Sequence, residues 1–186
     1  MKYINLIIYI LLSVFFSKNI FADEKIILEL QKGGNIIFIR HSLAPGNGDP
    51  DNIDLTDCST QRNLDSRGVE QSKKIGEFFK KNRIPIDRVL SSEWCRCKDT
   101  AKYAFKNFKT FDALNSFFSS KFAQNEEKQI KDLKNFIQNW KSEKNLVLVT
   151  HYVVISSMLN IGVNSGEIVI SNKSFELIGS IQTILK

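Results

Sequence analysis

The sequence is poor in the residues that build metal centres, and it has no apolar stretch long enough to cross a membrane as a helix. It contains two histidines and three cysteines, and its one Cys-x-Cys pair has no second pair to complete a structural zinc site. The most apolar segment, residues 4–16, falls short of the roughly 20 residues that a spanning helix needs. Internal repeats and low-complexity linkers are also missing. We therefore expect one domain that needs no metal and no cofactor.

The apolar segment near the N-terminus instead has the layout of an export signal. Lys2 precedes it, and a short polar stretch follows and ends at Ala22, a small residue suited to a cleavage site. No cysteine follows the segment directly, which argues against a bacterial lipoprotein. We expect a signal peptide at residues 1–22, a domain at residues 23–186, and a periplasmic or secreted protein whose mature chain has no membrane span. The alternative is a short anchor that stays uncleaved.

The composition is that of a globular protein. A hydrophobic share of 42% with 14 phenylalanines is enough to form a sizeable core. The formal net charge is +6, but the basic residues are scattered along predicted helices, as in the pairs Lys73-Lys74 and Lys80-Lys81. This scatter is typical of a solvated helix face, so we predict no nucleic-acid partner. A mild positive field would still favour an anionic substrate.

Short buried strands alternate with amphipathic helices along the chain. Strands are predicted at residues 35–39, 88–91, 109–114, 146–150, 167–170 and 175–184. Helices are predicted at residues 24–32, 64–83, 93–107, 126–141 and 153–159. This alternation predicts an α/β three-layer sandwich, with a mostly parallel mixed sheet and helices on both faces. A long polar loop, residues 42–63, is expected between the first strand and the second helix, and loops of this length are usually functional or mobile.

Both histidines of the chain follow a buried strand directly. His41 comes after Ile36–Arg40, and His151 comes after the strand that ends at Thr150. Ligands of open α/β sheets bind outside the carboxyl ends of the strands, so both imidazoles are expected to point into one pocket. Arg96 stands in the first turn after another strand, from which it can reach the same crevice. The alternative is that these are ordinary packed or surface side chains.

These residues together resemble the histidine phosphatase, or phosphoglycerate mutase-like, superfamily. The resemblance covers nearly the whole predicted mature domain. An Arg-His pair alone would be a weak signal, so the resemblance depends on several motifs together. The matching elements occur in the family's order: Arg40-His41, the step Leu64 to Gly68, the segment Ser91 to Ala101 that contains Arg96, and Thr150-His151. The resemblance implies a phosphoglycerate mutase-like fold.

The resemblance also implies a reaction. His41 would attack phosphorus and carry a phosphohistidine intermediate, Arg40 and Arg96 would hold phosphate oxygens, and His151 would add a further donor. The implied activity is a histidine-type phosphatase, a phosphoric monoester hydrolase acting on a phosphorylated small molecule, glycan or protein. No metal is required, because side chains supply the positive charge. A non-catalytic phospho-ligand binding module and a phosphomutase are the alternatives.

The chain departs from the family pattern where a general acid would stand. Leu114-Asn115-Ser116 places Ser116 where many members have a glutamate, and Tyr152 takes the place of the aspartate that acid phosphatases have after the second histidine. The acid is left open among four aspartates of the long loop: Asp49, Asp51, Asp54 and Asp57. Asp49 ranks first because its turn lies near the nucleophile, although turn-forming roles are the ordinary explanation. Arg62 is a further candidate contact to the substrate.

The three cysteines allow a disulfide if the protein is exported. Cys58 lies in the long loop, and Cys95 and Cys97 lie at the start of the helix after the second strand. We predict a bridge from Cys58 to either Cys95 or Cys97. The alternative is that all three thiols are free and pack as small apolar groups.

Overall fold

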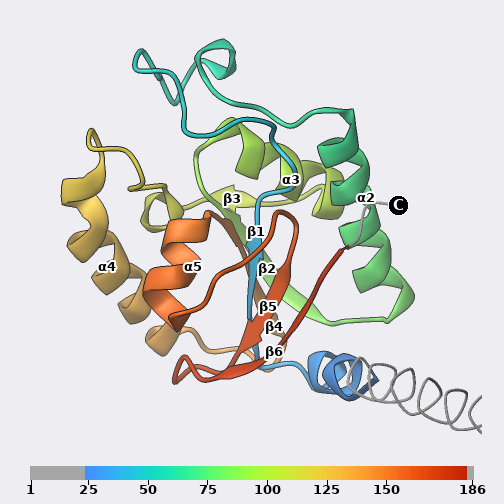
Figure 1. Cartoon of the computed structure of the whole chain (residues 1–186). Coiled ribbons are helices and arrows are strands. Elements are labelled where there is room, and N and C mark those ends of the chain that lie inside the picture. The colour runs from blue at the N-terminus through green and yellow to red at the C-terminus, as the bar shows by residue number, and fades with distance from the viewer. Residues whose placement is uncertain (1–23, 184–186) are drawn as a thin grey trace, which may run out of the picture.

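A six-stranded sheet forms the middle layer of the computed structural model, which describes residues 24–183 (Figure 1). The strand order is β3-β2-β4-β1-β5-β6. The strands are β1 (Ile36–Arg40), β2 (Ile86–Ser91), β3 (Lys109–Thr110), β4 (Asn145–Thr150), β5 (Ile168–Ser171) and β6 (Leu177–Ile181). β3, β2, β4 and β1 run parallel, and β5 and β6 continue the sheet antiparallel. This confirms the predicted mostly parallel mixed sheet.

The two central strands have apolar side chains on both faces, as a sheet covered by helices requires. β1 and β4 pair in parallel with Ile37 opposite Val147 and Phe38 opposite Leu148. The side chains of Ile37 and Val147 pack on one face, while those of Phe38 and Leu148 pack on the other. The continuous apolar runs in the sequence therefore reflect two separate cores, one on each face of the sheet.

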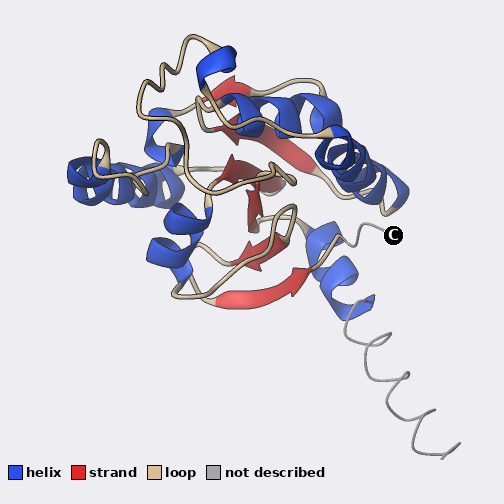
Figure 2. Cartoon of the chain, turned by 45° about the horizontal axis from the view of Figure 1, so that its top comes forward, coloured by secondary structure: helices blue, strands red, loops and turns tan. Residues whose placement is uncertain are grey.

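Helices cover both faces (Figures 1 and 2). α2 (Ser66–Lys81) and α3 (Cys95–Phe105) pack on the face of Ile37, and helical residues 24–32 add Leu30 to the same core. α4 (Glu126–Asn139) and α5 (Tyr152–Leu159) pack on the opposite face. The three-layer arrangement agrees with the sequence prediction. Among the described residues, no helix has the length and apolar character needed to cross a membrane.

One predicted strand is much shorter than expected. The segment 109–114 forms β3 only at Lys109–Thr110, and a 3-10 helix, Asp112–Leu114, follows. Ala113 and Leu114 are buried in the core that also contains Leu133 and Ile137 of α4, instead of continuing the ladder. Their burial made the segment look like a strand, because a short apolar run does not distinguish a strand from a buried turn. β6 likewise ends at Ile181, before the predicted boundary.

The start of α2 is fixed by a cap and by a close backbone contact. The Asp65 carboxylate accepts a hydrogen bond from the N–H of Gly68 and so caps the start of the helix. A Cβ atom at Gly68 would lie 2.0 Å from the carbonyl oxygen of Leu43. Gly68 therefore allows α2 to approach the residues that follow His41.

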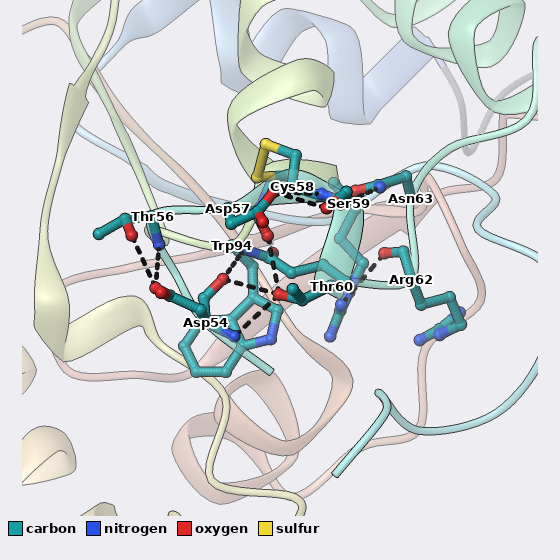
Figure 3. The surroundings of a disulfide bond; sticks show 12 residues. Asp54, Thr56, Asp57, Cys58, Ser59, Thr60, Arg62, Asn63 and Trp94 are labelled. Carbon is teal, nitrogen blue, oxygen red and sulfur yellow. Dashed lines mark hydrogen bonds between the residues drawn. A yellow bond between two sulfur atoms is a disulfide. The ribbon is translucent and has the colours of Figure 1, made fainter. Parts of the chain in front are cut away.

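The long loop between β1 and α2 arches over the carboxyl end of β1, at the top of Figure 1. Two of its aspartates stabilise turns. The Asp54 carboxylate accepts from the N–H and hydroxyl of Thr56, and the Asp57 carboxylate accepts from the N–H and hydroxyl of Ser59 (Figure 3). The predicted signal peptide lies outside the described residues.

Candidate active site

His41 follows β1 and is buried, with 2% of its surface exposed. Its Nδ1 lies 2.8 Å from the carbonyl oxygen of Ser42. A carbonyl oxygen only accepts, so Nδ1 carries the hydrogen and Nε2 keeps its lone pair. Burial, followed by the positive charge of Arg96, lowers the pKa of His41 well below its usual value. The imidazole is therefore neutral and has the tautomer that a nucleophilic nitrogen requires.

Ser42, the residue after His41, is held by contacts to two helices. Its N–H donates to Thr100 Oγ1 over 3.0 Å, and the Ser72 hydroxyl donates to its side-chain oxygen over 2.8 Å. Ser42 and Ser72 are both fully buried. These contacts fix the carbonyl that orients His41, so α2 and α3 both hold the residue next to the nucleophile.

His151 follows β4 and lies beside His41. Its Nε2 is 2.8 Å from Ser92 Oγ, which is in turn 3.1 Å from the amide oxygen of Asn115. The serine hydroxyl donates to the amide oxygen, so His151 Nε2–H donates to the serine. This network leaves Nδ1 without a hydrogen, facing Arg96 Nη2 at 3.5 Å. Burial and then the charge of Arg96 lower the pKa of His151 well below its usual value.

Arg96 lies in the first turn of α3, as predicted, with 3% of its surface exposed. Its Nη1 and Nη2 donate to the two carboxylate oxygens of Asp49 over 2.7 and 3.0 Å. Its Nε is buried and has no hydrogen-bond partner within the described residues. Asp49 therefore binds the Nη1 and Nη2 end of the guanidinium, and Nε is left to donate to another acceptor.

Two further arginines line the same cavity. Arg40 Nη1 donates to the carbonyl of Val163 over 2.7 Å, and its guanidinium lies 5.7 Å from the ring centre of Tyr152. Its Nε is also buried and unpartnered in the described part of the chain. Arg62 donates to the carbonyls of Ala44 and Gly48, so it braces the long loop from within the pocket.

These side chains surround a cavity of about 250 Å³ at the carboxyl ends of β1 and β4. All four residues that the sequence pointed to, Arg40, His41, Arg96 and His151, line it, and Arg62 lines it too. Ser116 is also part of the wall, which agrees with the position inferred for it from the family pattern. The rim carries Phe118, Lys121, Phe122 and Tyr152. The cavity is cationic and small, which suits a phosphoryl group with a modest part of its carrier.

The four candidate acids separate into two groups. Asp49 and Asp51 line the cavity, whereas Asp54 and Asp57 are used in the turns described above. Burial alone would raise the pKa of Asp49, but the hydrogen bonds and charge of Arg96 outweigh it and hold that pKa below its usual value. Asp49 is therefore an anion at neutral pH and is poorly suited to donate a proton. Sequence reasoning placed it in the pocket but did not find its pairing with Arg96, since nothing local in the sequence links the two.

The disulfide joins Cys58 to Cys95, one of the two predicted pairings (Figure 3). It ties the long loop to the first turn of α3, directly before Arg96. Cys97 is free and fully buried, with its sulfur 3.4 Å from His151 Nε2. Burial raises the pKa of the Cys97 thiol to about 12, so it is present as the neutral thiol.

Comparisons with known proteins agree with this fold. Residues 36–140 match the histidine phosphatase superfamily (branch 1), and the chain belongs to that superfamily. No curated protein sequence matches the chain.

Several solved structures share the fold at low sequence identity. The protein histidine phosphatase SixA complexed with tungstate has 12% identity and a TM-score of 0.57, over 80% of this chain and 97% of that one. The phosphoglycerate mutase from Thermus thermophilus has 15% identity and a TM-score of 0.57, over 80% and 98%. The alpha-ribazole phosphatase from Shigella flexneri has 15% identity and a TM-score of 0.56, over 73% and 89%. These likenesses establish a phosphoglycerate mutase-like fold.

Proposed function

We propose that this protein is an exported phosphatase that transfers a phosphoryl group from a phosphate monoester to His41 and then to water. The observation that carries the proposal is the hydrogen bond from His41 Nδ1 to the carbonyl of Ser42. It fixes the tautomer with hydrogen on Nδ1 and the lone pair on Nε2, while burial and the charge of Arg96 keep the ring neutral, in a pocket that also holds three guanidinium groups.

In the first step, His41 Nε2 forms a bond to phosphorus while the bond from phosphorus to the leaving oxygen breaks. The leaving group departs as an alkoxide or phenoxide and takes a proton from solvent. In the second step, water attacks phosphorus, the N–P bond breaks, inorganic phosphate leaves, and the proton from water passes to solvent. The Ser42 carbonyl supports the phosphorylated ring, which keeps its Nδ1 hydrogen and carries a positive charge. Arg40 and Arg96 offset the charge on the transferring oxygens, which is most of what phosphoryl transfer requires.

His151 can assist only with a proton on Nδ1, because its Nε2 hydrogen is used toward Ser92. A phosphate dianion beside it favours that protonation, since nearby negative charge raises the pKa of an imidazole. We therefore assign His151 the role of a donor that becomes charged when substrate enters.

The test uses the chain without residues 1–22 and p-nitrophenyl phosphate, whose good leaving group makes little demand on an acid. We expect turnover, and His41→Ala is expected to abolish it together with an acid-labile, base-stable phosphate label. Retained activity in His41→Ala would contradict the assignment of the nucleophile. Phosphate binding without turnover in the wild-type protein would favour the binding module. A phosphomutase would return the phosphoryl group to another hydroxyl of its substrate; p-nitrophenyl phosphate has none, so a sugar phosphate tests this alternative.

Export is proposed from the N-terminal sequence pattern, and a disulfide is compatible with an oxidising compartment. The test is the mass of the protein recovered from a bacterial periplasm. We expect a chain that starts after Ala22. A full-length chain retained in the membrane fraction would contradict cleavage.

A further inference from the structure

The Asp49 carboxylate accepts four hydrogen bonds, more than a carboxylate that only stabilises a turn in a loop requires. Its Oδ1 accepts from Arg96 Nη1 at 2.7 Å and from the N–H of Arg62 at 3.0 Å. Its Oδ2 accepts from Arg96 Nη2 at 3.0 Å and from Trp94 Nε1 at 3.2 Å. Trp94 is itself buried in the core on the α2 and α3 face, with 1% exposed. The position of the carboxylate is therefore set by the core and by the backbone of the loop.

A guanidinium presents two usable pairs of N–H groups to planar acceptors. One pair is Nη1 with Nη2 at the end, and the other is Nε with Nη2 along the side. In Arg96 the end pair is bound by Asp49, while Nε is buried without a partner among the described residues and Nη2 has a second hydrogen on the side of His151. An unpartnered buried donor is costly unless a ligand takes it. The side pair is therefore the part of Arg96 offered to an acceptor in the cavity.

We propose that Asp49 is a positioning residue: it binds the end of the Arg96 guanidinium so that Nε and Nη2 face the transferring phosphoryl group. This inference rests on the proposed phosphatase function and adds to it a residue that acts through Arg96. A fixed guanidinium is worth more than a mobile one, because a displacement of about 1 Å at a reacting site can cost about 100-fold in rate. Both carboxylate oxygens are occupied by donors, so Asp49 neither supplies a proton nor reaches phosphorus.

The variant Asp49→Asn distinguishes the positioning role from two alternatives: a role as general acid, and competition of the carboxylate with the substrate for Arg96. The amide keeps the size of the side chain, but its NH₂ group would oppose Trp94 Nε1–H and Arg96 Nη2–H, which are donors as well. Loss of a negative charge would, by charge alone, strengthen the binding of an anion. The positioning role predicts the opposite: affinity for inorganic phosphate, measured by calorimetry, falls about 10-fold. The matched control is Asp51→Asn on the cavity rim, which removes the same charge and should bind phosphate at least as well as wild type.

The activity measurements use two substrates with different leaving groups, p-nitrophenyl phosphate and phenyl phosphate. Asp49→Asn should lower kcat/KM about 10- to 100-fold for both. A loss confined to phenyl phosphate would show that Asp49 is a general acid and would overturn the proposal. Tighter phosphate binding in Asp49→Asn would show that the carboxylate competes with the substrate for Arg96, and would overturn it equally.

A double-mutant cycle with Arg96→Lys tests whether Asp49 acts through Arg96. A lysine has no second pair of donors to orient, so Asp49→Asn should add little to the loss in the Arg96→Lys background. Additive losses would contradict the proposal. Trp94→Phe is a second variant at the same contact: it removes one donor to Asp49 and leaves the charges intact. It should weaken phosphate binding in the same direction by a smaller factor, and an unchanged affinity would count against the role. Phosphate binding needs no turnover, so these outcomes stay readable even if His41 proves not to be the nucleophile.

Discussion

The rings of His41 and His151 lie edge to face, with their centroids 5.5 Å apart. They come from the ends of neighbouring parallel strands, β1 and β4, and both are buried. Burial and the charge of Arg96 lower the pKa of each imidazole, and the closeness of His41 contributes further to the lowered pKa of His151. The chain has two histidines, and both lie in this site. In an unfolded chain each would have the ordinary pKa of a histidine, about 6.5.

Stability should fall as the pH drops below about 6.5, the ordinary pKa of a histidine in an unfolded chain. The unfolded chain gains protons in this range and the folded chain does not, because both folded pKa values are lowered. Each histidine then costs at most about 1.4 kcal/mol per pH unit until its folded pKa is reached. Urea unfolding without phosphate at pH 7.5, 6.5 and 5.5 measures the slope.

The matched variant for this pH dependence is His151→Asn, which should remove about half of the slope. Carboxylates with a lowered pKa, such as Asp49, act at lower pH and do not mimic the effect. A free energy of unfolding that stays constant between pH 6.5 and 5.5 would show that the folded histidines take up protons like free ones.

Turnover should not depend on a divalent metal. Arg40, Arg62 and Arg96 line the cavity and supply the positive charge that a metal would otherwise bring to phosphoryl transfer. Incubation with EDTA should change kcat/KM for p-nitrophenyl phosphate by less than about 2-fold, since no step of the proposed reaction assigns a role to a metal. A large loss restored by zinc or magnesium would contradict the proposed chemistry.

The bridge between Cys58 and Cys95 should stabilise the protein by restricting the unfolded chain. With a sequence separation of 37 between the partners, loop closure is worth about 3–4 kcal/mol. Cys58→Ser should lower the free energy of unfolding by about that amount, and Cys97→Ala is the control that leaves the bridge intact. Alkylation of the unfolded, non-reduced protein should label one thiol, and three labelled thiols would rule the bridge out.

Gly68→Ala should destabilise the protein although alanine favours helices. The added Cβ would lie 2.0 Å from the Leu43 carbonyl, so α2 or the backbone after His41 must move, at a cost of about 1–3 kcal/mol. Gly162→Ala is the matched control, because its nearest neighbour would be the Tyr152 hydroxyl at 3.8 Å. Equal stability of the two variants, measured by urea unfolding, would contradict the close contact.

Local pattern was enough to predict the sheet, the helices and the shared pocket that Arg40, His41, Arg96 and His151 line. The apolar runs of β1 and β4 are buried on both faces, and the residue that follows a parallel strand lies at the binding edge of the sheet. His41 and His151 could therefore be placed in one pocket from the sequence. The strand predicted at residues 109–114 was too long: it ends at Thr110, and the buried residues after it form a 3-10 helix.

The choice among equivalent residues depended on contacts between distant parts of the chain. Cys95 and Cys97 stand two positions apart, and the fold alone decided that Cys95 meets Cys58 while Cys97 turns toward His151. The sequence likewise offered Asp49 as an acid, whereas the structure pairs it with Arg96. Strand ends follow from apolar periodicity, which is local. The partner of a carboxylate or a thiol follows from how the long loop crosses the start of α3, and no local pattern encodes that path.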